Sequence, residues 1–310
     1  MDTQVSGQVL VLFILIALGF ASYKLKITTK EAAVYFSSFA MKITLPCMIL
    51  VSFFRPFSRE LLGEAISTLG ISTVVYVISL SFALAYPHIL RITGPERGVH
   101  RYALFNPNSG LIGFPVIEAV LGPSFIFHAS MFNIPANIVA FSIGVWIVAK
   151  EGKKAPALSW KIFISPLFIV TIVGFVMFSF SLRLPWPIEQ SMRAAGSITS
   201  PLSMVVIGIS IAQADLKQVF GRWRIYVTVI IRLLVIPALV GISCYMAGVR
   251  GALLTLPVIL TAMPAGSTTS IFATVYDVAV EEAGSIVALS TMLSAFTIPL
   301  VVIAVHYFLG

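Results

Sequence analysis

Two clusters of polar and helix-breaking residues lie inside long apolar stretches of this chain of 310 residues. Proline has no backbone N–H donor and its ring clashes with the preceding turn, so a helix that contains either cluster should part there. The freed backbone groups, amides and hydroxyls would form a polar site, and the positive N-terminal end of the following half-helix would attract an anion. The predicted substrate-binding residues are Asn106, Pro107, Asn108, Ser109 and Gly110 in the first cluster, and Pro264, Ala265, Gly266, Ser267 and Thr268 in the second.

Four further residues are predicted to support this site. Asn133 and Asn137 are four residues apart and share one helix face, so both amides could face the first cluster. Hydrogen bonds that merely join helices are the alternative for this pair. Lys42 and Arg232 are cations within apolar stretches and could attract an anion. Snorkelling toward lipid headgroups is the alternative for Lys42, and a structural ion pair is the alternative for Arg232.

Both clusters must be held at membrane depth. The chain is 58% hydrophobic and 10% charged, with a mean hydropathy of +1.01, which excludes an ordinary water-soluble domain. Unwound backbone is tolerated in a membrane only where protein or a water-filled cavity surrounds it, so each break indicates a buried polar site or a proline kink that neighbouring helices satisfy. We predict an all-α membrane protein with ten transmembrane helices, at about residues 7–23, 31–54, 63–86, 102–120, 125–149, 160–181, 191–212, 223–247, 251–276 and 283–308.

The landmarks of the first half recur in the second half. Pro107 and Pro264 are 157 residues apart, and Pro46 and Pro201, which we interpret as bends in supporting helices, are 155 residues apart. Each half holds five predicted helices, and an odd number forces the second copy to be inverted. We therefore predict a 5+5 inverted repeat, with the first repeat over residues 1–150, the second over residues 151–310, a charged linker at 150–156, and broken, crossing helices 4 and 9.

Lys and Arg are distributed unevenly between the predicted loops, with thirteen on one side of the membrane and five on the other. The positive-inside rule then predicts a multi-pass protein of the inner (plasma) membrane with both termini outside and the 150–161 loop in the cytoplasm. The first apolar stretch lacks the features of a removable signal peptide, so we expect it to remain. The net charge of +8 is explained by cytoplasmic loops and anionic lipids, so no nucleic-acid partner is expected.

Sequence motifs for enzymatic chemistry are missing. The chain has no Gly-x-Ser-x-Gly, no His-Glu-x-x-His and no Gly-Lys-Ser/Thr phosphate loop, so we predict neither an enzyme nor an ATP-driven pump. The histidines and the two cysteines have no metal-ligand spacing, and we predict no metal and no cofactor. His128, Glu118 and Asp277 are candidates for proton coupling. Their positions favour a structural role for His128 and a membrane-surface location for the two acids.

The chain resembles the auxin efflux carrier family, with plant and bacterial members. The resemblance runs over nearly the whole length and rests on residues 43–46, 106–115 and 263–276. It implies a ten-helix inverted repeat in which helices 1, 2, 6 and 7 form a scaffold and helices 3–5 and 8–10 form a mobile unit. It also implies a homodimer with an elevator motion, and it matches Pro107, Asn108 and Pro264 to positions that bind a carboxylate.

Two departures from the plant pattern indicate a prokaryotic-type member of the resembled family. Only residues 150–161 stand where plant members have a long hydrophilic loop, and Gly110 stands where the plant pattern has tyrosine. The pocket is therefore expected to differ in shape, and auxin itself is not assumed as the substrate.

The predicted function is secondary transport of a small organic anion, such as a carboxylate or an auxin-like acid. Efflux is favoured because an inside-negative potential drives anions outward by about 2.3 kcal/mol per charge per 100 mV. The alternatives are a sodium- or proton-coupled symporter, as in bile acid carriers, an aquaporin-like channel and a membrane receptor. The second cluster reads Met-Pro-Ala, without the asparagine of aquaporins, and the short loops offer no signalling module. Predicted partners are the anion, the lipid bilayer and a second copy of the chain.

Overall fold

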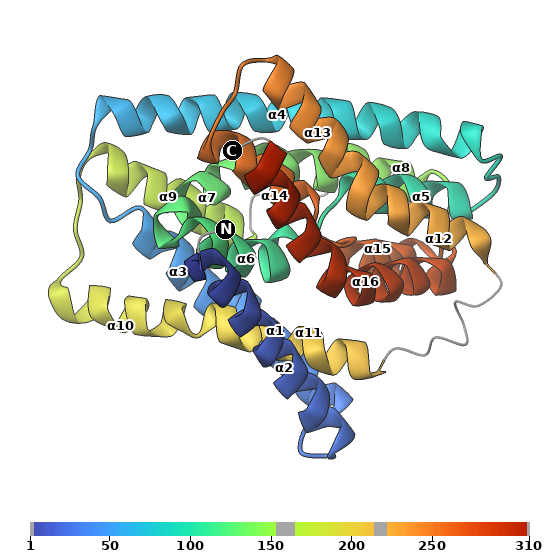
Figure 1. The fold of residues 1–310 in the computed structure, drawn as a ribbon, viewed down its shortest axis with the longest axis horizontal. Coiled ribbons are helices and arrows are strands. Elements are labelled where there is room, and N and C mark those ends of the chain that lie inside the picture. Colours follow the sequence, from blue (N-terminus) through green and yellow to red (C-terminus); the bar gives the residue numbers. More distant parts are fainter. Residues whose placement is uncertain (1–2, 153–164, 214–221, 309–310) are drawn as a thin grey trace. The chain divides into compact units, whose positions relative to one another are not determined.

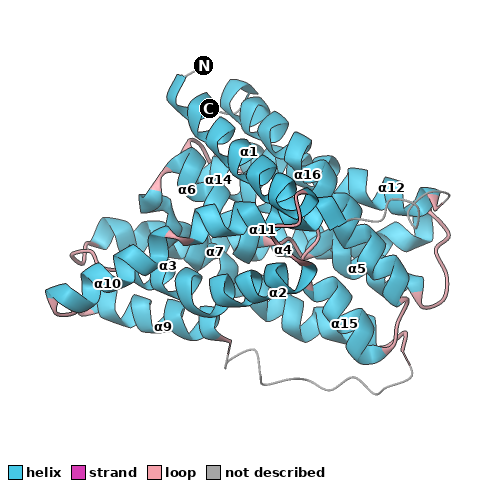
Figure 2. Ribbon diagram, turned by 90° about the horizontal axis from the view of Figure 1, so that it is seen from below, coloured by secondary structure: helices cyan, strands magenta, loops and turns pink. Residues whose placement is uncertain are grey.

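A computed structural model of the chain describes residues 3–152, 165–213 and 222–308. These residues form helices joined by short loops, which confirms the all-α prediction (Figure 2). Their one extended pairing is an isolated antiparallel bridge between Pro107 and Ala265. Residues 153–156 of the predicted linker at 150–156, and residues 153–161 of the 150–161 loop, lie outside the described residues.

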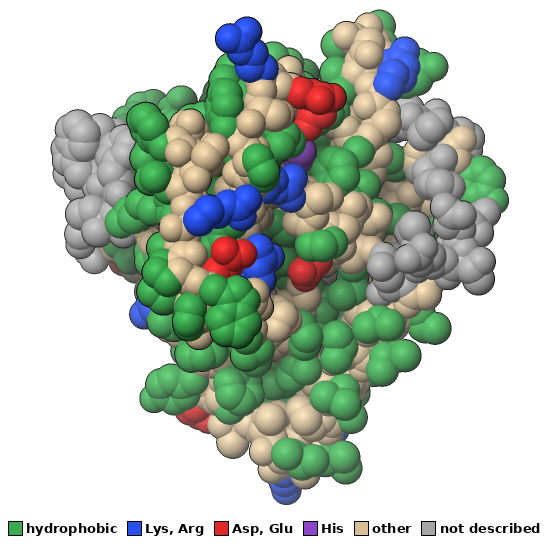
Figure 3. Space-filling view, turned by 90° about the vertical axis from the view of Figure 1, so that its left-hand side faces the viewer, with side chains coloured by type: hydrophobic (Ala, Val, Ile, Leu, Met, Phe, Trp, Pro, Cys, Tyr) green, Lys and Arg blue, Asp and Glu red, His purple; other side chains and the backbone are tan. Residues whose placement is uncertain are grey.

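Six helical stretches of the described chain are long and apolar enough to cross a membrane. Large apolar side chains are exposed along them, and Figure 3 shows hydrophobic side chains spread over a face that also carries a group of charged side chains. Such a surface suits contact with lipid, so the helices indicate a multi-pass membrane protein. The six stretches are Lys30–Ser52, Arg59–Ile89, Pro123–Ala149, Trp186–Gln213, Trp223–Met246 and Val280–Val305, and the shorter apolar helices are Leu10–Lys24, Ser109–Leu121, Pro166–Ser179 and Ala252–Thr261.

The chain divides into two compact units, and the first comprises Met1–Gly70, Gly110–Ile134 and Lys161–Gln213. Two long helices, α4 (Arg59–Ile89) and α7 (Ile126–Val139), begin in this unit and end in the second. The other helices of the first unit are α1 (Thr3–Lys24), α2 (Lys30–Phe39), η1 (Ala40–Thr44), α3 (Leu45–Ser52), α6 (Phe114–Leu121), η3 (Pro123–Phe125), α9 (Pro166–Ser179), α10 (Trp186–Ser197) and α11 (Thr199–Gln213) (Figure 1).

Glycines bring the helices of the first unit into backbone contact. A Cβ atom added at Gly208 would lie 2.0 Å from the carbonyl oxygen of Ile16, and one added at Gly19 would lie 2.1 Å from that of Val205. Helices α1 and α11 therefore touch along their backbones, as small residues allow in membrane proteins.

The second unit comprises Ile71–Ser109, Pro135–Trp160 and Ala214–Gly310. It holds both predicted helix breaks. Its helices are α5 (Glu96–Phe105), η4 (Ala140–Gly144), α8 (Val145–Ala149), α12 (Trp223–Ile230), η7 (Ile231–Val235), α13 (Ile236–Met246), α14 (Ala252–Thr261), α15 (Thr268–Tyr276) and α16 (Val280–Phe308), and it supplies the first residue of η2 (Ser109–Gly113).

Prolines distort several helices in one recurring way. Pro46, Pro115 and Pro237 each stand second in an α-helix that directly follows a wide π-helical turn, namely η1, η2 or η7. A proline cannot donate to the carbonyl four residues earlier, so the preceding turn widens. Pro201 differs, since it lies in the first turn of α11, just after α10 ends.

Candidate functional site

Both predicted helix breaks are present. Helix α5 ends at Phe105 before η2 begins at Ser109, and helix α14 ends at Thr261 before α15 begins at Thr268. We call residues 106–108 and 264–266, which lie in these breaks, the crossover segments.

The crossover segments pair with each other through two backbone hydrogen bonds. The amide of Asn108 donates to the carbonyl of Pro264 at 2.8 Å, and the amide of Gly266 donates to the carbonyl of Asn106 at 2.9 Å. Backbone groups that leave a helix inside a membrane protein must find partners within the protein. Each break therefore supplies a hydrogen-bond partner for backbone groups of the other break, and the two predicted clusters meet.

Side chains reinforce this pairing at Thr268, the first residue of α15. The Asn106 side-chain amide donates to the Thr268 hydroxyl at 2.7 Å, and the Tyr102 hydroxyl donates to the same oxygen at 3.3 Å. A Cβ atom added at Gly266 would lie 2.6 Å from the Asn106 amide nitrogen. Only glycine at position 266 leaves room for the Asn106 side chain to reach the Thr268 hydroxyl.

Helix α16 holds the second crossover segment from its other side. The amide of Ala265 donates to the hydroxyl of Ser290 at 3.1 Å. Nearby in α15, the hydroxyl of Thr269 is fully buried and has no hydrogen-bond partner among the described residues. This hydroxyl is free to bind a ligand at the positive end of α15.

Aromatic rings support the end of α5. Tyr102 meets Phe105 and Phe272 edge to face, with ring centroids 5.3 and 5.5 Å away, and Phe141 packs against Phe272 in the same way at 5.6 Å. A Cβ atom at Gly144 would lie 2.6 Å from the Tyr102 ring. The ring packing fixes the position of Tyr102 and, through α5, that of the first break.

Arg232 places a buried positive charge close to the first break. Its side chain is 1% exposed, and one terminal nitrogen donates at 3.0 Å to the carbonyl of Leu104, two residues before Asn106. The Nε and the second terminal nitrogen have no partner among the described residues. The ion pair that competes with a substrate role is thus not formed within the described chain, and the guanidinium keeps donors for an anion.

The remaining predicted residues of the two clusters lie at the edges of the breaks. Ser109 begins η2 and is partly exposed, Gly110 has the side chains of Leu45 and Leu167 as its nearest neighbours in the first unit, and Ser267 is exposed just before α15. Their contacts with a substrate stay predictions.

The predicted supporting residues divide between the two units. Lys42 is exposed on η1, Asn133 is buried with its amide donating to the Ala129 carbonyl at 2.8 Å, and Asn137 lies in the second unit. A role for these three residues at the crossover stays a prediction. Asn133 already uses one amide donor within its own helix.

His128 and Glu118, two of the proton-coupling candidates, lie in the first unit. His128 is 5% exposed, and its Nε2 atom lies 2.9 Å from a carboxylate oxygen of Glu64, which fits the structural role. Glu118 accepts a hydrogen bond from Ser200 and lines an open pocket of about 430 Å³ together with Arg55 and other residues. Neither residue belongs to the crossover segments.

A buried histidine–carboxylate pair in the second unit is absent from the sequence-based predictions. His100 on α5 and Glu282 on α16 are 0% and 4% exposed, and the Nε2 and Oε1 atoms are 3.1 Å apart. They are separated by 182 residues, so no local spacing indicates the pair. Glu96 adds a third donor atom within 4.8 Å of both, but Arg222 already occupies the second oxygen of Glu282 at 2.8 Å. This arrangement favours an ion-pair network over a metal site.

The proteins that this chain resembles are membrane transport proteins. The profile of a family described as membrane transport protein matches residues 4–157 and 155–302. An uncharacterized transporter of Methanocaldococcus jannaschii is 23% identical over 94% of this chain and 96% of its own. The "Putative malonate transporter" of Rhizobium meliloti is 22% identical over 95% of this chain and 94% of its own. An uncharacterized transporter of Escherichia coli is 22% identical over 95% of each chain. The chain therefore belongs to the membrane transport protein family, as the motifs around its helix breaks indicate.

Proposed function

We propose that this transporter is a secondary carrier that moves a small organic anion, a mono- or dicarboxylate, by alternating access around the crossover segments. The observation that carries the proposal is the buried guanidinium of Arg232, which has no acidic partner among the described residues. A buried charge costs several kcal/mol unless it is paired. A carboxylate would pair it with the two-pronged geometry that a guanidinium prefers.

The crossover supports the same class of substrate. Helix α15 begins directly after the second crossover segment, and its N-terminal end carries partial positive charge. The free hydroxyl of Thr269 lies in its first turn. A carboxylate bound there would receive hydrogen bonds from groups that no described residue uses, without stripping partners from the protein.

The division of the helices gives partial support to a moving unit, since α6 and the first parts of α4 and α7 belong to the first unit. Both crossover segments belong to the second unit, whereas helices α1, α2, α3, α9, α10 and α11 belong to the first. These six include the helices that family resemblance assigns to the scaffold. In our proposal the second unit carries the anion across the membrane, as in an elevator, and the assembly is a homodimer of inverted-repeat chains in the inner membrane with both termini outside.

The relative from Rhizobium meliloti carries malonate in its name, which makes a dicarboxylate the first substrate to test. An inside-negative potential would favour efflux of such an anion, by about 2.3 kcal/mol per charge per 100 mV. The proposed site requires only that the substrate be a small molecule with a carboxylate group.

Counterflow in liposomes tests the proposal. Vesicles that contain the purified protein and unlabelled malonate, succinate or acetate should accumulate the same labelled carboxylate, and uptake should saturate. The neutral analogue malonamide should not be taken up, because it cannot pair with Arg232. Replacement Asn108→Ala should lower carboxylate counterflow by at least about tenfold. Equal uptake of malonamide, water flux without saturable carboxylate uptake, or an unaffected Asn108→Ala variant would contradict the proposal.

A further inference from the structure

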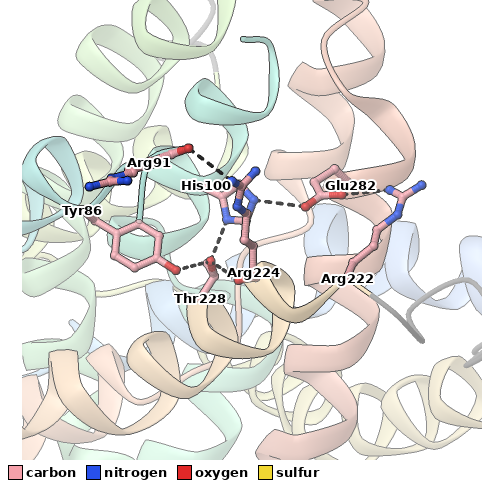
Figure 4. Close-up of polar contacts among 7 residues, drawn as sticks. All are labelled: Tyr86, Arg91, His100, Arg222, Arg224, Thr228 and Glu282. Atoms are coloured by element: carbon pink, nitrogen blue, oxygen red, sulfur yellow. Dashed lines mark hydrogen bonds and ion pairs between the residues drawn. The ribbon is translucent and has the colours of Figure 1, made fainter. Parts of the chain in front are cut away.

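A chain of hydrogen bonds surrounds His100 inside the second unit (Figure 4). Its Nδ1 atom lies 2.6 Å from the hydroxyl of Thr228, and its Nε2 atom lies 3.1 Å from Oε1 of Glu282. The hydroxyl of Tyr86 also lies 2.6 Å from that of Thr228, and Thr228 itself donates to the carbonyl of Arg224 at 2.9 Å. His100 and Tyr86 are 0% and 1% exposed, so water does not complete these bonds.

The number of hydrogen-bond donors around the Thr228 oxygen constrains the proton position on His100. A threonine hydroxyl has a single proton and two lone pairs, and the proton of Thr228 is directed at the Arg224 carbonyl. All three contacts of the Thr228 oxygen are hydrogen bonds only when the other two are donated to it. Tyr86 supplies one proton through its hydroxyl, and His100 supplies the other through an N–H at Nδ1.

The contact between His100 and Glu282 then requires one further proton. A neutral histidine with its proton on Nδ1 has only a lone pair on Nε2, which would face a lone pair of an ionised Glu282 at 3.1 Å. One added proton turns this repulsive contact into a hydrogen bond, whether nitrogen or oxygen holds it. With His100 protonated at Nδ1, its contact with Glu282 is a hydrogen bond only when the pair carries that further proton.

Acidic and basic side chains surround the pair. Glu96 lies beside the pair on α5, and Arg222 donates to the outer oxygen of Glu282 at 2.8 Å. Arg222 is shared between Glu282 and the neighbouring Glu281, at 2.8 and 3.2 Å. The other charged or titratable groups on these and adjacent helices are engaged elsewhere or exposed, namely Arg97 with Glu151, Arg101 with His88, Arg224 with the Arg91 carbonyl, and Glu281, 82% exposed, with Arg222.

We propose that His100 and Glu282 form a proton-binding site that couples proton movement to carboxylate transport. The proposal rests on the carboxylate carrier function proposed above. Asn106, which directly follows α5, lies six residues after His100, and Ser290 lies eight residues after Glu282 on α16, or about 9 and 12 Å along the helix axes. The same two helices hold both crossover segments. Loss of the proton leaves His100 Nε2 and Glu282 Oε1 as two acceptors that face each other. Their repulsion loosens the packing of α5 on α16 and thereby changes the crossover segments that bind the anion.

The wild-type protein provides the first test. Liposomes that contain it and an entrapped pH-sensitive dye are given a malonate gradient, with the membrane potential clamped at zero. We expect a proton flux that starts with the malonate flux and scales with it. Malonate counterflow without proton movement would overturn the proton site but leave the carrier function intact. Absence of counterflow for every carboxylate would overturn both proposals.

Two variants locate the site. Replacements His100→Gln and Glu282→Gln remove the titrating groups, and each should lower the number of protons moved per malonate by at least about tenfold. The matched control is His88→Gln, because His88 is an exposed histidine of the same unit that contacts only the Arg101 side chain among the described residues. This control should keep the wild-type proton flux. Equal proton flux in all three variants would contradict the assignment, and the wild-type measurement decides the coupling even if one variant fails to fold.

Discussion

The hydroxyl of Thr199 donates a hydrogen bond to the hydroxyl of Thr44 at 2.9 Å, across 155 residues of sequence. Each threonine stands two residues before a landmark proline, Pro46 or Pro201. Two equivalent residues of a repeat touch each other only where they flank its symmetry axis. The contact joins two residues at the spacing of the predicted inverted repeat, which stays a prediction.

A second pair of contacts follows the same spacing. Gly208 packs on the backbone of Ile16 and Phe20, on either side of Gly19, while Gly174 packs on the ring of Phe53. Gly174 lies 155 residues after Gly19, and Gly208 lies 155 residues after Phe53. Glycine thus brings α1 close to α11 and α9 close to α3.

Gly266→Ala tests the close approach at the crossover. The added Cβ would lie 2.6 Å from the Asn106 amide nitrogen, so the asparagine must leave its acceptor. We expect carboxylate counterflow to fall by at least about tenfold, since a displaced binding group costs transition-state stabilisation. Gly284→Ala is the control, because a Cβ there has no neighbour within 4 Å. Equal loss in both variants would contradict the proposed geometry.

Thr268→Val removes the acceptor that Asn106 and Tyr102 share. A buried donor left without its acceptor costs about 1–3 kcal/mol, so the thermal unfolding temperature and the transport rate should both fall. The control Thr274→Val alters an exposed hydroxyl of the same helix, which bonds only the Ser270 carbonyl. Thermal unfolding in detergent and counterflow in liposomes measure the two effects. A Thr268→Val variant as stable and active as the control would be the contrary result.

Arg232→Met separates a substrate role from a structural one. Among the described residues the buried guanidinium makes one hydrogen bond and leaves two nitrogens without partners, so its charge costs stability in the empty protein. We expect the variant to unfold at an equal or higher temperature while carboxylate counterflow falls by at least about tenfold. Arg250→Met, in an exposed turn of the same unit, should leave transport unchanged. A structural role for Arg232 predicts the reverse, with stability lost and transport per folded molecule retained.

Gly208→Ala tests the packing of α1 on α11. The new methyl group would lie 2.0 Å from the Ile16 carbonyl oxygen, so the helices must separate. Overpacking of this kind costs about 1–3 kcal/mol, and the unfolding temperature should fall accordingly. Gly63→Ala on α4, where a Cβ meets nothing within 4 Å, should leave the unfolding temperature within error of the wild type. No difference between these variants would show that the two helices do not touch as described.

The sequence predicts the helix breaks because proline and glycine act locally. Pro107 and Pro264 lie in the breaks together with polar and glycine residues, and the matched spacing indicates that the two breaks belong together. The acceptor role of Thr268 toward Tyr102 depends on tertiary packing, which no local pattern encodes. His100 and Glu282 escape prediction for the same reason, since 182 residues separate them.

The central claim is that paired, unwound segments bind a carboxylate, and equilibrium binding tests it most directly. Isothermal titration of malonate into the purified wild-type protein should give saturable binding. Asn108→Ala and Gly266→Ala should each raise the Kd by at least about tenfold, or about 1.4 kcal/mol, whereas Thr274→Val should leave it unchanged. If both crossover variants bind malonate as tightly as the wild type, the carboxylate does not bind at the crossover and the account is wrong.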